Sequence, residues 1–156
     1  MGEGGQGDER MLKSFYHTGF IVRDLEQSVR FYTDVLGMNV ARRMEREGEF
    51  INQVLGFPDT HIKGAFVARG EGHQLELIQY ISPPSGPGGI ERNDLGAAHL
   101  AFFVEDMDRF YAEKSQQGLR FINPPAEQRD DNGALQRKVA YSQDPDGNWL
   151  EFIEDF

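Results

Sequence analysis

Tyr16-His17-Thr18-Gly19-Phe20-Ile21-Val22-Arg23-Asp24-Leu25 is the stretch that decides the fold, because its pattern returns 82 residues further along the chain. The second copy is Ala98-His99-Leu100-Ala101-Phe102-Phe103-Val104-Glu105-Asp106-Met107. Aligning His17 with His99 gives a shared order of His, two residues, Phe, one residue, Val, one residue and Asp. Internal repeats set the architecture of a chain that contains them. This repeat predicts two similar structural units.

Each copy leads into the same succession of elements. Apolar residues at helical spacing predict helices over residues 25–36 and 107–114, each closed by a glycine, Gly37 and Gly118. A second echo lies near the end of each unit, where Leu75-Glu76-Leu77-Ile78 matches Leu150-Glu151-Phe152-Ile153. Runs rich in apolar residues predict strands over 17–22, 38–44, 62–68, 74–80, 97–104, 119–123, 135–142 and 149–153. The predicted order is β-α-β-β-β, twice, in an α+β fold.

Composition divides the chain into four parts. Residues 1–11 are Gly-rich and polar, which predicts a disordered tail, and residues 12–80 form the first module. Residues 81–93 are rich in Pro and Gly, which stop helices and strands and so predict a linker. Residues 94–156 form the second module. With 38% hydrophobic residues, the 156-residue chain has enough apolar material for a packed core.

Charge and cysteine content exclude several classes of function. The formal charge of −10 repels phosphate backbones and anionic membranes, so we expect neither nucleic acid nor membrane as a partner. No apolar run approaches the roughly 18 residues that span a bilayer. The chain has no cysteine, which excludes disulfides and thiolate chemistry and fits a cytoplasmic protein.

Strand parity converts the repeat into a candidate metal site. Alternate residues of a strand share a face, so if Phe20 and Val22 face the helix, His17 faces the other way, and His99 does the same in its unit. In the closing strands, the apolar residues on either side of each glutamate face the helix: Leu75, Leu77, Leu150 and Phe152. Glu76 and Glu151 are then placed on the same face as the two histidines. Two nitrogen and two oxygen donors suit Zn, Ni, Co, Mn or Fe(II), and the predicted ligands are His17, Glu76, His99 and Glu151.

The alternative interpretation makes each histidine a hydrogen-bonded core residue and each glutamate a partly exposed strand residue. It weakens when all four fall at equivalent places in a repeated unit. His61, in a polar loop, and His73, with parity opposite to Glu76, are interpreted as surface residues.

Residues 49–58 carry several large apolar groups between the second and third strands. They predict either a short helix over a pocket or a hydrophobic flap that covers a sheet edge. Together with nearby aromatic residues they favour a hydrophobic or aromatic substrate, although the same residues are compatible with an ordinary core. The predicted substrate-binding residues are Ile21, Phe50, Tyr80, Phe103 and Trp149.

The residues from His17 to Met38, together with Asp144-Pro145-Asp146-Gly147 before Leu150-Glu151-Phe152, resemble the vicinal oxygen chelate superfamily of glyoxalases, bleomycin resistance proteins and extradiol dioxygenases. The chain is most similar to the glyoxalase I branch. The resemblance covers nearly everything from residue 12 onward. It implies two βαβββ modules whose curved, mixed sheet forms a cup around one metal ion, with the four predicted ligands at the family's ligand positions.

A glyoxalase I-like site implies a lyase or isomerase that removes a proton next to a carbonyl, through enediolate chemistry. Glu151 or Glu76 is the base, and the sequence does not choose between them. Glyoxalase I holds glutathione with an arginine and an asparagine at positions that match Ile21 and Tyr80 here, both of them uncharged. The cations nearest the predicted site are Arg23, Arg42, Arg43 and Lys63, interpreted chiefly as a solvated face.

Two other functions remain open from the sequence. An Fe(II) or Mn(II) ring-cleaving dioxygenase uses two histidines and one carboxylate, and the fourth predicted ligand counts against it. A metal-free protein that binds a drug or natural product and confers resistance has no need of four ligands. The family resemblance also implies a homodimer, with the site either within one chain or shared between two.

Overall fold

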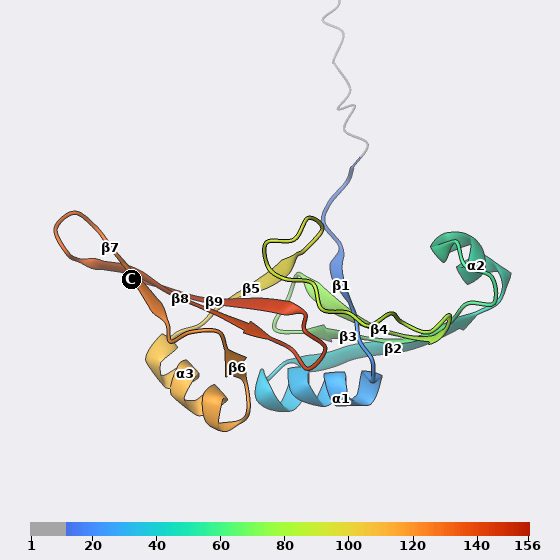
Figure 1. Cartoon of the computed structure of the whole chain (residues 1–156), viewed down its shortest axis with the longest axis horizontal. Helices are drawn as coiled ribbons and strands as arrows, with labels where there is room; N and C mark the ends of the chain where they lie inside the picture. Colours follow the sequence, from blue (N-terminus) through green and yellow to red (C-terminus); the bar gives the residue numbers. More distant parts are fainter. Residues whose placement is uncertain (1–11) are drawn as a thin grey trace, which may run out of the picture.

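The computed structural model describes residues 12–156, and the tail expected at residues 1–11 lies outside the described residues. The chain forms two modules, each with its own sheet (Figure 1). Module 1 contains β1 (His17–Ile21), α1 (Leu25–Arg30), the π-helical turn η1 (Phe31–Val35), β2 (Asn39–Glu47), α2 (Glu49–Leu55), β3 (His61–Ala68) and β4 (Gln74–Ser82). Module 2 contains β5 (His99–Phe103), α3 (Met107–Gln116), β6 (Arg120–Phe121), β7 (Ala126–Arg129), β8 (Leu135–Gln143) and β9 (Trp149–Asp155).

The two sheets repeat one topology. The first has the order β1-β4-β3-β2, and the second has the order β5-β9-β8-β6 with β7 also paired to β8. In each, the first strand runs parallel to the last strand of its module and the other pairs are antiparallel. The predicted α+β class and its two βαβββ modules are confirmed. Helices α1 and α3 lie on the same side of the molecule, below both sheets in the view of Figure 1.

The aspartate shared by the two copies of the repeat begins each helix. Oδ1 of Asp24 accepts a hydrogen bond from the amide of Gln27 at 2.9 Å, and Oδ1 of Asp106 accepts one from the amide of Arg109 at 2.9 Å. Such N-caps satisfy amides that lack a partner in the first turn. Gly37 and Gly118 follow the helices with φ of +71° and +92°, a conformation that glycine adopts without steric cost.

Burial confirms the predicted strand parity. The core contains Phe20 of β1 and Val22 directly after it. The corresponding residues of β4 and β9 are also buried: Leu75, Leu77, Leu150 and Phe152. His17 and His99 therefore point to the opposite face of each sheet, which we call the open face. Core residues of the two modules form a single cluster, so the modules pack together on the helix side.

One junction between the modules is tied by three hydrogen bonds, one of them buried. The hydroxyl of Tyr32, in η1, donates to Oδ2 of Asp144, in the turn before β9, at 2.9 Å. Oδ1 of Asp146 accepts from the amide of Arg23 at 2.9 Å, and the side-chain amide of Asn148 donates to the carbonyl of Ile21 at 3.2 Å. Burial raises the pKa of Tyr32, reinforced by the charge of Asp144, and burial also raises the pKa of Asp144 despite the hydrogen bonds it accepts.

The junction related to it by the internal repeat is open. Here a cavity of about 570 Å³ lies between residues 34–38 with Arg69 in module 1 and the β5–α3 segment in module 2, lined by Phe103, Glu105 and Lys114 among others. Arg69 donates to the carbonyl of Gly37 at 2.9 Å, within its own module. The modules are thus bonded on one side and separated on the other.

Three local predictions differ from the structure. His61 begins β3 rather than lying in a loop, because its strand pairs with β2 up to Glu47. Strand β7 has no apolar alternation and is exposed throughout, so it exists only by pairing with β8. The predicted helix over residues 25–36 passes from α1 into the wider turn η1, which carries the fully buried Tyr32.

Residues 49–58 do include a helix, α2, at the end of the β2–β3 hairpin and far from module 2 (Figure 1). Ile51 is buried, whereas Phe50 and Val54 point outward with 73% and 59% exposure. Among the helices of residues 12–156, none has both the length and the apolar content required to cross a bilayer.

Candidate metal centre

The open face of module 1 holds the first predicted pair. His17 Nε2 lies 2.9 Å from Oε2 of Glu76, whose side chain is only 12% exposed. The two strands bring them together because Gly19, two residues after His17, pairs directly with Glu76. The ring of His17 packs edge-on against Phe66, with 5.2 Å between ring centroids. Its Nδ1 is buried and has no hydrogen-bond partner among the described residues.

Module 2 repeats this pair on its own open face. His99 Nε2 lies 3.1 Å from Oε2 of Glu151, and the register is the same, since Ala101 pairs with Glu151. Tyr141 lies opposite Glu151 on β8 and packs edge-on against His99, with ring centroids 5.3 Å apart. Burial and the neighbouring Glu151 carboxylate both raise the pKa of Tyr141, so its hydroxyl stays protonated near neutral pH.

The four predicted ligands form two pairs and not one cluster. Within residues 12–156 of a single chain, no three His, Asp or Glu side chains gather in an arrangement that suits a metal ion. Each pair offers one nitrogen and one oxygen donor. Two such pairs are needed to surround a divalent cation with four protein ligands.

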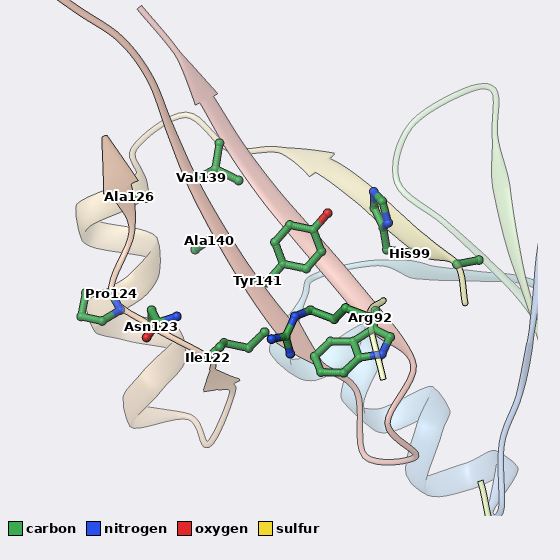
Figure 2. A pocket seen from close by; sticks show the side chains of 11 residues that line it. Arg92, His99, Ile122, Asn123, Pro124, Ala126, Val139, Ala140 and Tyr141 are labelled. Atoms are coloured by element: carbon green, nitrogen blue, oxygen red, sulfur yellow. The ribbon is translucent and has the colours of Figure 1, made fainter. Parts of the chain in front are cut away.

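A cavity of about 410 Å³ opens beside the second pair (Figure 2). His99 and Tyr141 border it on one side, and Ile122, Pro124 and Val139 give it an apolar wall. Trp149 also lines it, with its indole nitrogen donating to the carbonyl of Ile90 at 2.8 Å. The side chain of Arg92 lies over the Trp149 ring, 4.8 Å from its centroid.

The five predicted substrate-binding residues are dispersed in the single chain. Ile21 and Trp149 line a cavity of about 420 Å³ at the module boundary, and Phe103 lines the open junction. Tyr80 packs edge-on against Phe57, with ring centroids 6.4 Å apart, and Phe50 is exposed on α2. Of the predicted cations, Arg42 contacts a neighbour of the first pair: its guanidinium lies 3.9 Å from the centroid of Phe66.

Sequence reasoning missed two residues beside the second pair. Tyr141 pairs directly with Glu151 across β8 and β9, so both side chains point to the same face of the sheet. Strand alternation could therefore have placed Tyr141 beside the second pair. Arg92 comes from the segment that precedes β5, and no periodicity places a loop side chain. His73 is exposed as predicted, and its Nε2 lies 2.7 Å from the hydroxyl of Thr18. The side chain of His61 is 28% exposed, and its Nε2 lies 2.6 Å from Oε1 of the exposed Glu45.

The family model of the Glyoxalase/Bleomycin resistance protein/Dioxygenase superfamily matches residues 14–152. The chain belongs to this superfamily. A solved structure of a glyoxalase family protein from Bacillus cereus superposes with a TM-score of 0.82, covering 96% of this chain and 99% of that one, at 20% sequence identity. At this identity the superposition confirms the fold only.

Two curated relatives resemble the chain more closely in sequence. Glyoxalase I of Saccharomyces cerevisiae is 30% identical over 150 residues, which is 88% of this chain and 43% of that protein. A 2-epi-5-epi-valiolone epimerase of an Actinomyces species is 32% identical over 143 residues, covering 88% of this chain and 77% of that protein. The predicted resemblance to the glyoxalase superfamily is thus confirmed, and its relatives include both a glyoxalase and an epimerase.

Proposed function

We propose that this protein is a divalent-metal-dependent isomerase, epimerase or lyase that moves a proton on the carbon next to a substrate carbonyl. The observation that carries the proposal is the repeated His–Glu pair, with equal register in both modules. Glu76 and Glu151 are largely removed from water on faces that carry aromatic neighbours. Burying a carboxylate is costly without a compensating charge, and a cation bound by both pairs supplies it.

The donor set fits such an ion. Two imidazole nitrogens and two carboxylate oxygens suit Zn, Ni, Co, Mn or Fe(II) and leave positions for substrate oxygens. In His17, Nδ1 is buried and Nε2 lies beside Glu76. Nε2 is therefore the nitrogen that would bind the metal ion together with Glu76. The four side chains that would hold the ion are His17, Glu76, His99 and Glu151.

We further propose that the site forms between two copies of the chain, with module 1 of one facing module 2 of the other. A single chain keeps the pairs apart, so a partner is needed to unite them. Apolar side chains near the pairs are exposed in the single chain, including Ile21 at 43% and Phe103 at 77%. Exposed apolar surface of this kind marks contact sites between proteins.

The chemistry follows from the residues around the second pair. A bound divalent cation supplies Lewis-acid polarisation of the substrate carbonyl, which acidifies the adjacent C–H bond. We assign the base to Glu151, because its partner His99 lines the 410 Å³ cavity. Glu151 would take that proton and return it to the neighbouring carbon on the same face. Tyr141 keeps its phenolic proton, because its pKa is raised, and lines the cavity next to Glu151.

Complementation between two inactive variants tests the proposal. One variant carries His17→Ala and Glu76→Ala, and the other carries His99→Ala and Glu151→Ala. Each alone is expected to lose tight metal binding, measured by elemental analysis after dialysis. Mixing them under conditions that exchange subunits creates heterodimers with one intact site, so about one quarter of the sites recover at random pairing.

The matched control is the surface pair of His61 and Glu45, which has similar separation but faces solvent. The variant with His61→Ala and Glu45→Ala should bind metal like the unaltered protein. Absence of recovery after demonstrated subunit exchange contradicts the shared site. Retention of full metal content by either double variant contradicts the ligand assignment itself.

A further inference from the structure

The cavity beside the second pair is unusual for its charge. The whole chain has a formal charge of −10, yet the lining of this cavity contains no Asp or Glu from the described residues. Arg92 gives the lining a formal positive charge, and the polar side chains of Asn123 and Tyr141 also line the cavity. In a low-dielectric, partly enclosed space, a cation of this kind attracts an anion more strongly than it does in open water.

The guanidinium of Arg92 is available to a ligand. Its ion pair with the adjacent Glu91 is long, at 3.8 Å, and the side chains of Arg92 and Glu91 are 46% and 69% exposed. Arg92 donates no side-chain hydrogen bond to any of the residues 12–156 recorded in the structure. Arg42, which stacks on Phe66 beside the first pair, differs because its Nη2 donates to the hydroxyl of Tyr16 at 2.7 Å.

Stacking on Trp149 holds the guanidinium in place. The ring centroid lies 4.8 Å from Cζ, within the range of a favourable cation–π contact. The indole is itself held by its hydrogen bond to the carbonyl of Ile90 and by burial, since Trp149 is only 6% exposed. A pre-positioned guanidinium loses little freedom when it accepts a carboxylate or phosphate in its planar fork.

We propose that Arg92 is the residue that selects the substrate, by binding a carboxylate or phosphate group of a small carbonyl compound. Trp149 lies directly opposite His99 on the neighbouring strand, and strands are about 4.8 Å apart. The anion on Arg92 and the carbonyl near His99 therefore belong to one short molecule, a keto or hydroxy acid or a phosphorylated carbonyl compound. The role in a reaction rests on the proposed function, whereas anion binding by Arg92 requires no metal.

Fluorescence of Trp149 tests the inference without measuring activity, because it is the only tryptophan of the chain. Metal is stripped, the chelator is removed, and the protein is titrated at pH 7.5 and constant ionic strength. The probes are pyruvate, which carries a carboxylate, inorganic phosphate, and hydroxyacetone as an uncharged relative of pyruvate. We expect at least one anion to give a saturable change, and hydroxyacetone to bind about 10-fold more weakly or not at all.

Arg92→Gln should raise the dissociation constant of that anion about 10-fold to 100-fold, as expected for loss of a charge-assisted hydrogen bond. Arg92→Lys keeps the charge without the fork and should fall between the two. Arg109→Gln, on the exposed face of α3, is the matched control and should leave the constant unchanged. Unfolding midpoints of all variants show whether each retains its fold.

The result for each probe identifies the anion, since saturation by pyruvate alone indicates a carboxylate and by phosphate alone a phosphate ester. The inference is overturned if neither anion saturates, if hydroxyacetone binds as well as pyruvate, or if Arg92→Gln binds like the unaltered protein. Metal binding without anion binding refutes this inference alone. Anion binding that depends on Arg92 in a protein that takes up no metal refutes the proposed function alone.

Discussion

The two modules hold the same His–Glu pair in different surroundings. His17 lies against Tyr16 and Phe66, with ring centroids 4.4 and 5.2 Å away, and its side chain is 27% exposed. The aromatic ring recorded against His99 is that of Tyr141, and the His99 side chain is 48% exposed beside an open cavity. The two modules thus share the donor atoms but differ in what can approach them. Under the proposed function, this difference assigns ion binding chiefly to module 1 and substrate entry to module 2.

The sharpest way to break this comparison is to neutralise each glutamate separately. Glu76→Gln and Glu151→Gln should both weaken metal binding by about 10-fold or more, because each removes a charged ligand. At saturating metal, Glu151→Gln should also slow exchange of the substrate C–H proton with D₂O by about 100-fold or more, as loss of a general base does. Exchange is followed by NMR on the substrate that the anion titrations identify.

Glu45→Gln is the control for that experiment, since Glu45 also lies next to a histidine but on the surface. It should change neither metal binding nor exchange. Equal loss of exchange in Glu76→Gln and Glu151→Gln at full metal occupancy contradicts the division of roles between the modules.

The two junctions between modules should differ in their contribution to stability. Asp144→Ala leaves the buried hydroxyl of Tyr32 without its acceptor and should lower the free energy of unfolding by about 2–4 kcal/mol. Tyr32→Phe removes only the donor and should cost about 1 kcal/mol. Arg69→Ala, at the open junction, should cost less than about 1 kcal/mol. Urea unfolding measures all three, and a larger effect at Arg69 reverses the assignment.

Stability should also depend on pH through Asp144. Burial raises its pKa in the folded state, so folding favours the protonated carboxyl. Its contribution is therefore fully present below the pKa of an unfolded aspartate, about 3.9, and is lost as pH rises through the higher folded value. Asp144→Asn removes this titration. Relative to Asp144→Asn, the unaltered protein should lose unfolding free energy as pH rises through the folded pKa of Asp144, and the difference should then level off. A difference that does not change with pH contradicts this prediction.

The smallest expected effect on the single chain concerns its exposed aromatic residues. Phe103→Ser should change the unfolding free energy of the monomer by less than about 0.5 kcal/mol, because its side chain is already in water. If a partner covers it, the same substitution weakens self-association several-fold in sedimentation experiments. Phe50→Ser on α2 is the comparison, and an unchanged association constant for Phe103→Ser would exclude that residue from the interface.

The repeat in the sequence predicted the two modules, the start of each helix and the shared face of His17 and Glu76, because strand parity and helix caps are local properties. It did not predict strand β7, whose residues are all exposed and carry no pattern. Arg92 escaped for a similar reason, since a side chain in a loop has no period. Whether four ligands meet depends on contacts between modules or between chains, which local patterns do not encode.

The bond between Tyr32 and Asp144 joins residues 112 positions apart. During synthesis at about 5–20 residues per second, the phenol therefore waits on the order of 10 s for its acceptor. Until Asp144 has been synthesised, the hydroxyl of Tyr32 lacks the acceptor that it has in the folded protein. A chain cut before Asp144 lacks this hydrogen bond, so the packing of module 1 against module 2 depends on residues made more than a hundred positions later.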